Sequence, residues 1–179
     1  MGLYRAKCDR CNFEQKISGL PRYYRLSAGV VIHVETEWAW CASCESVVPS
    51  EKIRSLEDVQ RELDALVARE PDMVEWVRDL ALPSGDFEAT YQREVAQFTS
   101  RRDWRQSRQS LPRCLECGGT AITPFVWRDT DDDLDAEEFE TIEHPSCGGR
   151  IHLRCVGLVR PAVVFYYTPE GLRYDDHAV

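Results

Sequence analysis

The middle of the chain has a helical pattern of apolar positions. Three runs between residues 50 and 111 carry it: Leu56, Val59, Leu63, Leu66 and Val67; then Met73, Val74, Trp76, Val77 and Leu80; then Phe87, Tyr91, Val95 and Phe98. Spacing of three and four residues predicts three amphipathic helices, each with one apolar face. Ser55 fits the N-cap of the first helix, Pro71 and Pro83 separate the helices, and Pro112 stops the third.

Both flanks of this segment have patterns typical of β-strands. Residues 13–17 and 30–40 precede the helical segment, whereas residues 121–127, 151–156 and 162–168 follow it, and all are rich in β-branched or aromatic side chains. Residues 168–171 have the composition of a turn, and a loose tail is expected after them.

The chain holds eight cysteines. Its first residues lack the apolar stretch of a secretory signal, and no run approaches the roughly 18 apolar residues of a membrane span. We therefore expect an intracellular, cytoplasmic chain without a membrane segment. In that setting, cysteines bind metal more often than they form disulfides.

Two C-x-x-C pairs, Cys8/Cys11 and Cys41/Cys44, lie in the first segment with 29 residues between them. A gap of two residues lets a tight turn, or knuckle, aim both sulfurs at one ion. Two such knuckles supply the four thiolates of a structural zinc site. A thioredoxin-like redox pair is an alternative, but it needs a βαβ context that this segment lacks. Reduced core cysteines would not explain the paired spacing.

A second pair of knuckles lies near the C-terminus. The strings Cys114-Leu-Glu-Cys117-Gly-Gly and His144-Pro-Ser-Cys147-Gly-Gly align position for position, with 26 residues between them. The glycines suit the positive φ that such a turn needs. These strings predict a zinc site made of Cys114, Cys117, His144 and Cys147. His152 or Cys155 replaces His144 in the alternative ligand sets, and Cys155 otherwise fits a small core residue.

On these knuckles, each cysteine-containing segment resembles a zinc ribbon of the rubredoxin-like class. The C-terminal segment is similar to the ribbons of RNA-polymerase cleavage and elongation factors, in which an acidic hairpin joins two knuckles. In that family an Asp-Glu pair at the hairpin tip helps to place a catalytic metal in the polymerase. This chain departs from the family pattern, since one ligand is His144 and no Asp-Glu dipeptide occurs between residues 129 and 143.

The patterns together predict an α+β protein in which a segment of about three helices joins two small antiparallel zinc-ribbon units. The expected boundaries are 1–49 for the N-terminal ribbon, 50–111 for the helical segment, 112–168 for the C-terminal ribbon and 169–179 for the tail. Each site has four protein ligands, so we expect two structural Zn²⁺ ions per chain. Metal binding should contribute much of the folding free energy of the ribbons.

The net charge of −9 is concentrated in an acidic block between Asp129 and Glu143 that has no Lys or Arg. Such a block repels nucleic acid and favours a protein partner with a basic surface, as in an immunity or antitoxin-type inhibitor. A solvated loop is the alternative. The partner-binding candidates are Asp131, Asp132, Asp133, Asp135, Glu137 and Glu138.

One basic cluster offers a different function. Its members Arg101, Arg102, Trp104, Arg105 and Arg108 suit phosphate contact with stacking on the indole, which would indicate a nucleic-acid- or polymerase-associated factor. The solvated C-terminal end of a helix explains the same cluster without a ligand. No nucleophile motif, phosphate-binding loop or dinucleotide fingerprint occurs, so we expect a binding protein and not an enzyme.

Overall fold

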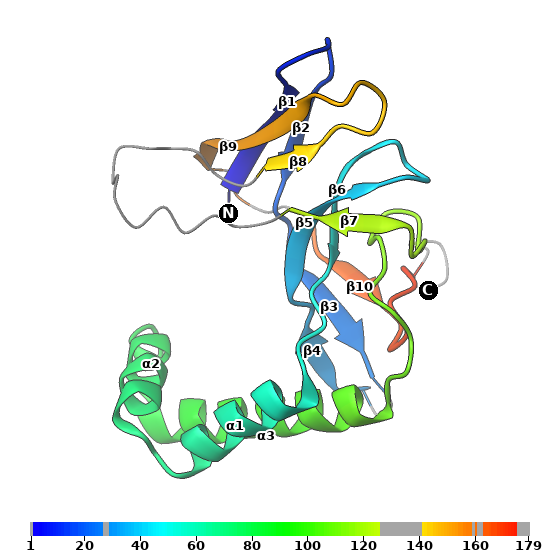
Figure 1. Cartoon of the computed structure of the whole chain (residues 1–179). Helices are drawn as coiled ribbons and strands as arrows, with labels where there is room; N and C mark the ends of the chain where they lie inside the picture. The colour runs from blue at the N-terminus through cyan, green and yellow to red at the C-terminus, as the bar shows by residue number, and fades with distance from the viewer. Residues whose placement is uncertain (1, 27–28, 126–140, 159, 161–162, 175–179) are drawn as a thin grey trace. The chain divides into compact units, whose positions relative to one another are not determined.

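The computed structural model describes residues 2–26, 29–125, 141–158, 160 and 163–174. These residues form a mixed α+β protein with three helices and ten strands (Figure 1). The prediction of an α+β fold with three helices is confirmed. The described helices include none that is both long enough and apolar enough to cross a membrane.

The chain divides into two compact units. The first, here the β unit, contains residues 1–24, 33–52 and 111–179, and the second, the helical unit, contains residues 25–32 and 53–110.

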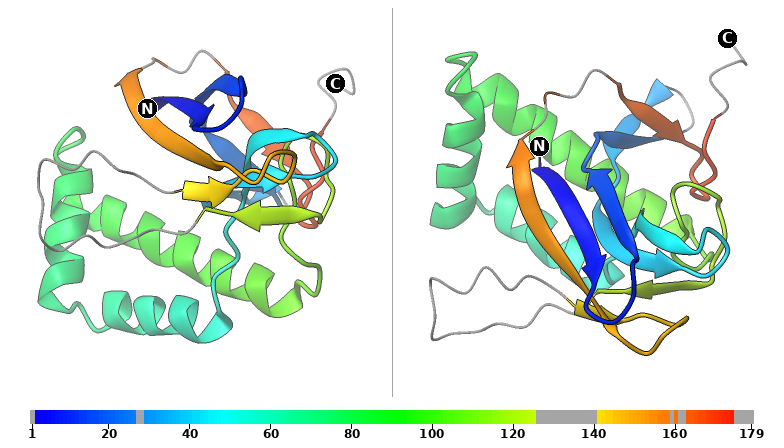
Figure 2. Two further views of the ribbon diagram at one scale, coloured as in Figure 1. Left: turned by 45° about the horizontal axis from the view of Figure 1, so that its top comes forward. Right: turned by 90° about the horizontal axis from the view of Figure 1, so that it is seen from above.

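A four-stranded antiparallel sheet in the β unit has the order β2-β1-β9-β8. Its strands are β1 (Gly2–Cys8), β2 (Glu14–Ser18), β8 (Thr141–Glu143) and β9 (Arg150–Leu158). Figure 2 shows β1 between β2 and β9. Alternate residues of β1 and β9 are buried, among them Ala6, Ile151 and Leu153, so one face of this sheet is core.

A second antiparallel sheet in the β unit has the order β6-β5-β7. It consists of β5 (Thr36–Cys41), β6 (Ser46–Glu51) and β7 (Ile122–Pro124). Its buried residues Trp40 and Val47 pack into the same core cluster as Ala6, Ile151 and Leu153 of the first sheet. The two sheets of the β unit therefore share one hydrophobic core.

A third sheet, of order β10-β3-β4, contains β3 (Arg22–Arg25), β4 (Val31–His33) and β10 (Phe165–Tyr167). β10 pairs with β3 in parallel, in contrast to the antiparallel pairs above. The buried Tyr167 at its end donates a hydrogen bond of 3.0 Å from its hydroxyl to the carbonyl oxygen of Leu115.

The helical unit is built from α1 (Leu56–Val67), α2 (Pro71–Ala81) and α3 (Phe87–Ser107). One core cluster of this unit contains one buried residue from each helix, Leu66, Val77 and Tyr91. Ser55 caps α1 by accepting a hydrogen bond from the amide of Asp58 at 3.0 Å, as the sequence predicts. The Tyr91 hydroxyl donates to the carbonyl oxygen of Leu66 at 3.0 Å and so ties α3 to α1.

The expectation of one ribbon per cysteine-containing segment is corrected. Strands from both segments share each of the two antiparallel sheets, because β1 pairs with β9 and β5 pairs with β7. Residues 1–24, 33–52 and 111–179 accordingly belong to one compact unit. The alternation that predicts each strand does not specify its neighbour. A single shared core also suits a small protein, because the fraction of surface buried rises with the size of the unit.

Candidate metal centres

The first candidate metal centre, the Cys₃His group, joins the two ends of the chain. It contains Cys8, Cys11, His144 and Cys147, whose ligand atoms all lie within 4.8 Å of one another. Cys8 ends β1, and His144 directly follows β8. The antiparallel pairing of β1 with β9 sets Cys8 opposite Ile151, which brings the turn after β1 to the turn before β9.

Short contacts link the two halves of the Cys₃His group. The Cys8 Sγ lies 3.5 Å from the Cys147 Sγ, and the Cys11 Sγ lies 3.3 Å from His144 Nδ1. Nδ1 is also 3.2 Å from the Cys147 Sγ, so this ring nitrogen faces the sulfurs. The imidazole is buried, and its ring centroid lies 5.1 Å from those of both Phe13 and Trp40. Aromatic packing therefore fixes the orientation of the one nitrogen ligand.

The second candidate centre, the Cys₄ group, contains Cys41, Cys44, Cys114 and Cys117. Cys41 ends β5, where it pairs with Ile122 of β7. An isolated β-bridge between Ser50 and Cys114 holds the third knuckle against β6. Backbone pairing of β5 and β6 with residues 114–124 thus brings the Cys41/Cys44 knuckle to the Cys114/Cys117 knuckle.

Sulfur spacing in the Cys₄ group matches a tetrahedral ion. The Cys41 and Cys117 sulfurs are 3.7 Å apart, and the Cys44 and Cys114 sulfurs are 3.8 Å apart. A tetrahedron with Zn–S bonds of about 2.3 Å has edges of about 3.8 Å. The separations far exceed a disulfide bond of about 2.05 Å, and all eight cysteines are free thiols. The geometry suits one four-coordinate metal ion.

The two C-terminal knuckles share the same backbone hydrogen bonds. The amide of Gly118 donates to the carbonyl of Cys114 at 2.9 Å, and that of Gly148 donates to the carbonyl of His144 at 2.8 Å. Both glycines have positive φ, +73° and +65°, as their alignment in the sequence predicts. An N–H also points at sulfur in each knuckle, since the next glycines, 119 and 149, donate to Cys117 and Cys147 at 3.4 Å.

These backbone donors affect the acidity of the ligands. Burial opposes ionisation of the Cys8 thiol, but hydrogen bonds from the amides of Arg10 and Cys11 lower its pKa to about 6. Burial raises the pKa of the Cys114 thiol to about 11, and it also raises that of Cys44. Since a metal ion binds thiolates, metal binding at neutral pH must release protons from these buried thiols.

The structure brings together all eight cysteine and histidine ligands that the sequence predicts, but it pairs the knuckles differently. The first knuckle meets the fourth, and the second meets the third. The expected local pairing of Cys8/Cys11 with Cys41/Cys44, and of Cys114/Cys117 with His144/Cys147, is wrong. Gaps of 29 and 26 residues permit local pairing, but the strand neighbours place each knuckle beside a more distant one.

The alternative ligands lie outside both groups. Nε2 of His152 is 3.9 Å from a carboxylate oxygen of Asp9, and its side chain is partly exposed. Cys155 is exposed, with its sulfur 3.5 Å from the carbonyl oxygen of Gly157. The expectation that Cys155 fits a small core residue is therefore wrong. The acidic candidates Asp131, Asp132, Asp133, Asp135, Glu137 and Glu138 lie outside the described residues.

The arginine cluster of α3 is largely engaged within the helical unit. Trp104 is buried with 8% of its surface exposed, so it offers no platform for a base. Arg108 lies over the Trp104 ring and donates to the Ser110 hydroxyl, and Arg105 donates to the carbonyl oxygens of Arg54 and Arg108. Arg102 pairs with the neighbouring Asp103, and Arg101 lies over Phe98. These contacts stabilise the end of α3, so the stacking proposed for Trp104 is corrected.

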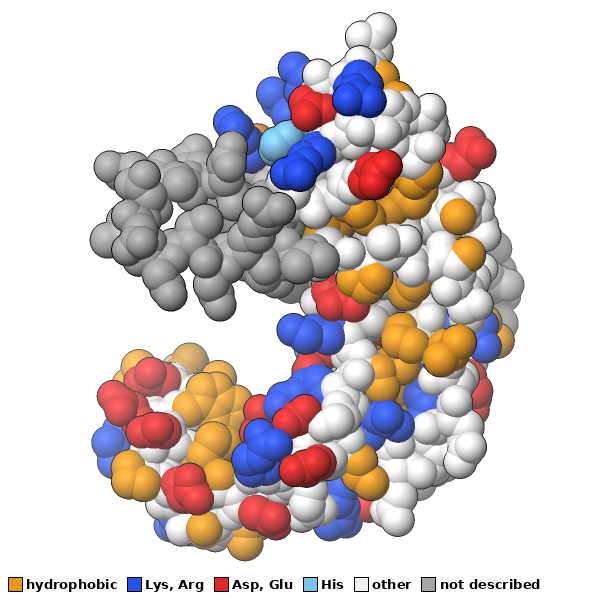
Figure 3. Space-filling view, viewed as in Figure 1, with side chains coloured by type: hydrophobic (Ala, Val, Ile, Leu, Met, Phe, Trp, Pro, Cys, Tyr) orange, Lys and Arg blue, Asp and Glu red, His pale blue; other side chains and the backbone are white. Residues whose placement is uncertain are grey.

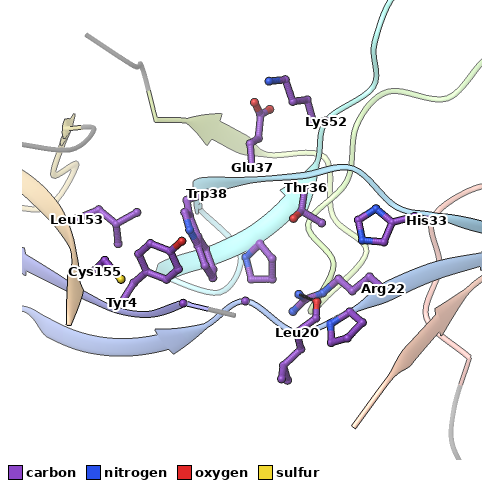
Figure 4. A pocket seen from close by; sticks show the side chains of 14 residues that line it. Tyr4, Leu20, Arg22, His33, Thr36, Glu37, Trp38, Lys52, Leu153 and Cys155 are labelled. Carbon is purple, nitrogen blue, oxygen red and sulfur yellow. Dashed lines mark hydrogen bonds between the residues drawn. The ribbon is translucent and has the colours of Figure 1, made fainter. Parts of the chain in front are cut away.

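A hollow of about 650 Å³ also lies in the β unit (Figure 4). Tyr4, Trp38 and Leu153 line one side of it, and the Tyr4 and Trp38 rings meet edge to face at 5.3 Å. Glu37 and Lys52 line another part. Burial raises the pKa of the Glu37 carboxyl, against the opposing effect of the Lys52 charge.

Sequence reasoning missed one further feature of the β unit. The cations Arg5, Lys7 and Arg154 lie together with His152 on the face of the first sheet that is opposite the core. Each alternates with apolar residues along its strand, and this alternation was a readable signal. The alternation predicts a shared cationic face only when β1 and β9 are known to be neighbours in one sheet.

Comparisons of the chain with protein-family models, with curated proteins and with solved structures find no match.

Proposed function

We propose that this protein is a zinc-dependent, non-enzymatic binding module, in which two structural zinc ions fold the β unit. One observation carries the proposal: the four knuckles converge into two separate groups of four ligands each. Thiolate-rich sets with four protein ligands are typical of structural zinc, whereas catalytic zinc keeps a position open for water.

The place of the two groups in the fold supports a structural role. Each joins segments far apart in sequence, and Cys8, Cys41 and Cys114 are fully or almost fully buried. Two of the strands next to the knuckles are short, with three residues in both β7 and β8. Strands of this length bury little apolar surface, so metal coordination supplies stability that the core alone does not.

A protein partner is the binding function that the helical unit favours. Trp76 and Leu80 lie one turn apart on α2 and remain 37% and 41% exposed. Val67 at the end of α1 is 57% exposed. Neighbouring exposed apolar side chains such as Trp76 and Leu80 on one helix face are a feature of protein contact surfaces. The acidic block, proposed from the sequence to meet a basic partner surface, would act in addition to them.

Metal content and metal removal test the proposal. Native mass spectrometry of the full chain should show two zinc ions, and the variants Cys8→Ser and Cys41→Ser should each hold one. Cys155→Ser is the matched control, since this cysteine belongs to neither group, and it should keep both ions. Removal of zinc with a chelator should then increase the hydrogen exchange of the backbone amides of β1 and β9, while the amides of α1, α2 and α3 stay protected. A fully folded chain without metal would contradict the proposal.

A further inference from the structure

The outer face of the four-stranded sheet carries an array of three cations, Arg5, Lys7 and Arg154, together with His152. In the register of β1 and β9, Arg5 is opposite Arg154, and Lys7 is opposite His152. Residues two apart on a strand share a face, so all four side chains lie on the side opposite the buried Ala6, Ile151 and Leu153. On β2, Lys16 is opposite Arg5, and the carboxylate of Glu14 is opposite Lys7.

The array lines a shallow groove of about 580 Å³. Arg5, Lys7 and Arg154 are exposed, and His152 is partly exposed. Figure 3 shows Lys and Arg side chains gathered beside a histidine at the top of the molecule. Asp9, Cys8, Cys155 and Val156 complete the lining of the groove.

Carboxylates neutralise only part of this charge. Arg5 is 3.6 Å from Glu14, in an ion pair that is about half exposed and therefore weak. Asp9 lies 3.9 Å from His152 and accepts a hydrogen bond from the amide of Arg150. The ion pairs found on this face of the described residues involve Arg5 and His152, and not Lys7 or Arg154. The groove therefore keeps a positive local charge in a chain of net charge −9.

A structural role does not account for the array. Like charges directly opposite each other on neighbouring strands destabilise a sheet, and Arg5 faces Arg154 in this way. The opposite face already supplies the core, so the outer residues are free to vary without loss of packing. Because these cations repel one another and destabilise the sheet, their clustering indicates a negatively charged ligand whose binding offsets the repulsion.

We propose that this face of β1 and β9 binds the phosphate backbone of a nucleic acid without reading its sequence. Arginine and lysine side chains supply the phosphate contacts, while no Phe, Tyr or Trp ring lines the groove for a base to stack on. The inference rests on the metal-folded β unit of the proposed function and goes beyond it, because it adds a nucleic-acid partner to the protein partner proposed for the helical unit.

Salt-dependent binding of a fluorescent 20-base-pair duplex by the full-length, zinc-loaded chain tests this site. Release of counterions by about four phosphate contacts predicts a slope of log K against log salt of about −3 to −4. The double variant Arg5→Gln/Arg154→Gln should reduce that slope by about two and weaken binding at 50 mM salt at least tenfold, since each cation contributes about one to the slope.

The control Arg61→Gln/Arg93→Gln changes the net charge equally, at exposed positions of the helical unit. It should bind the duplex like the parent chain. Equal loss in both double variants, absence of duplex binding at 50 mM salt, or equally tight binding of poly-glutamate would overturn the proposal.

Two further readouts separate this inference from the proposed function. The Arg5→Gln/Arg154→Gln variant should retain two zinc ions, and its free energy of unfolding should stay the same or rise because a like-charge pair is relieved. If the parent chain holds no zinc, the metal proposal is wrong. If the Arg5→Gln/Arg154→Gln variant holds two zinc ions and binds the duplex as tightly as the parent chain, only the nucleic-acid proposal is wrong.

Discussion

The Cys8 sulfur lies 3.5 Å from the Cys147 sulfur, although the two residues are 139 positions apart. Their contact joins the end of the first strand to the last knuckle. Both knuckles of the Cys₄ group lie between these two points in the sequence. Closing so long a loop is entropically costly, and metal coordination offsets that cost. The two centres are thus nested, with one pair of knuckles enclosed by the other.

Replacing Gly148 by Ala should weaken metal binding at the Cys₃His group. Its φ of +65° is strained for any residue with a Cβ, at a cost of about 1–2 kcal/mol, or roughly five- to thirtyfold in zinc affinity. Chelator competition measures this change. Gly157→Ala is the control, because its Cβ would meet open space and its φ is not in the left-handed region. Equal affinities for the two variants would contradict the account of the knuckle.

The buried Glu51 should be important for the stability of the β unit. Its carboxylate accepts hydrogen bonds from the Tyr24 hydroxyl at 2.7 Å and from the amide of Arg113 at 2.9 Å. Glu51→Ala deprives both donors of this acceptor, and we expect a loss of about 2–4 kcal/mol in urea unfolding of the zinc-loaded chain. Glu51→Gln keeps one acceptor oxygen and should lose less. A loss below 0.5 kcal/mol for Glu51→Ala, on the order of a surface substitution, would count against this network.

N-caps should contribute measurably to the helical unit. The Asp86 side chain accepts a hydrogen bond from the amide of Ala89 at 2.9 Å, whereas Glu70, at the N-cap of α2, makes no such bond. Replacing Ser55 or Asp86 by Ala should each cost about 1 kcal/mol. Glu70→Ala should be near neutral in the same denaturant titration. A cost for Glu70→Ala as large as that for Asp86→Ala would mean that capping is not the cause.

The sequence identified local features well, because these depend on neighbouring residues. The three- and four-residue spacing of residues such as Leu63, Leu66 and Tyr91 predicts the helices. Paired spacing and the glycines after Cys117 and Cys147 predict the knuckles. Each of these signals lies within one turn or one helix face.

Strand partners could not be predicted in this way. β1, β3, β6 and β8 escaped prediction, since segments such as Arg22–Arg25 and Ser46–Glu51 lack clear alternation of apolar and polar residues and Thr141–Glu143 lies in the acidic block. Residues 30–40 form two strands, β4 and β5, where one was expected. Nothing in the spacing of Cys8 shows that β1 pairs with β9, so the pairing of knuckles and the cationic face both depended on long-range register.

The central claim is the nested pairing of the knuckles, and ¹¹³Cd NMR of cadmium-substituted chains tests it most directly. A site with four sulfur ligands and a site with three sulfurs and one nitrogen give separate resonances. The structure predicts that Cys8→Ser removes the resonance of the Cys₃His site and that Cys114→Ser removes that of the Cys₄ site. Cys155→Ser should leave both resonances in place.

Local pairing predicts the reverse assignment. If Cys8→Ser removed the four-sulfur resonance and Cys114→Ser removed the resonance with a nitrogen ligand, the nested arrangement would be wrong, and each half of the chain would hold its own ion. If Cys8→Ser leaves the four-sulfur resonance intact while the other is lost, the first and last knuckles share one metal ion, as the structure has them.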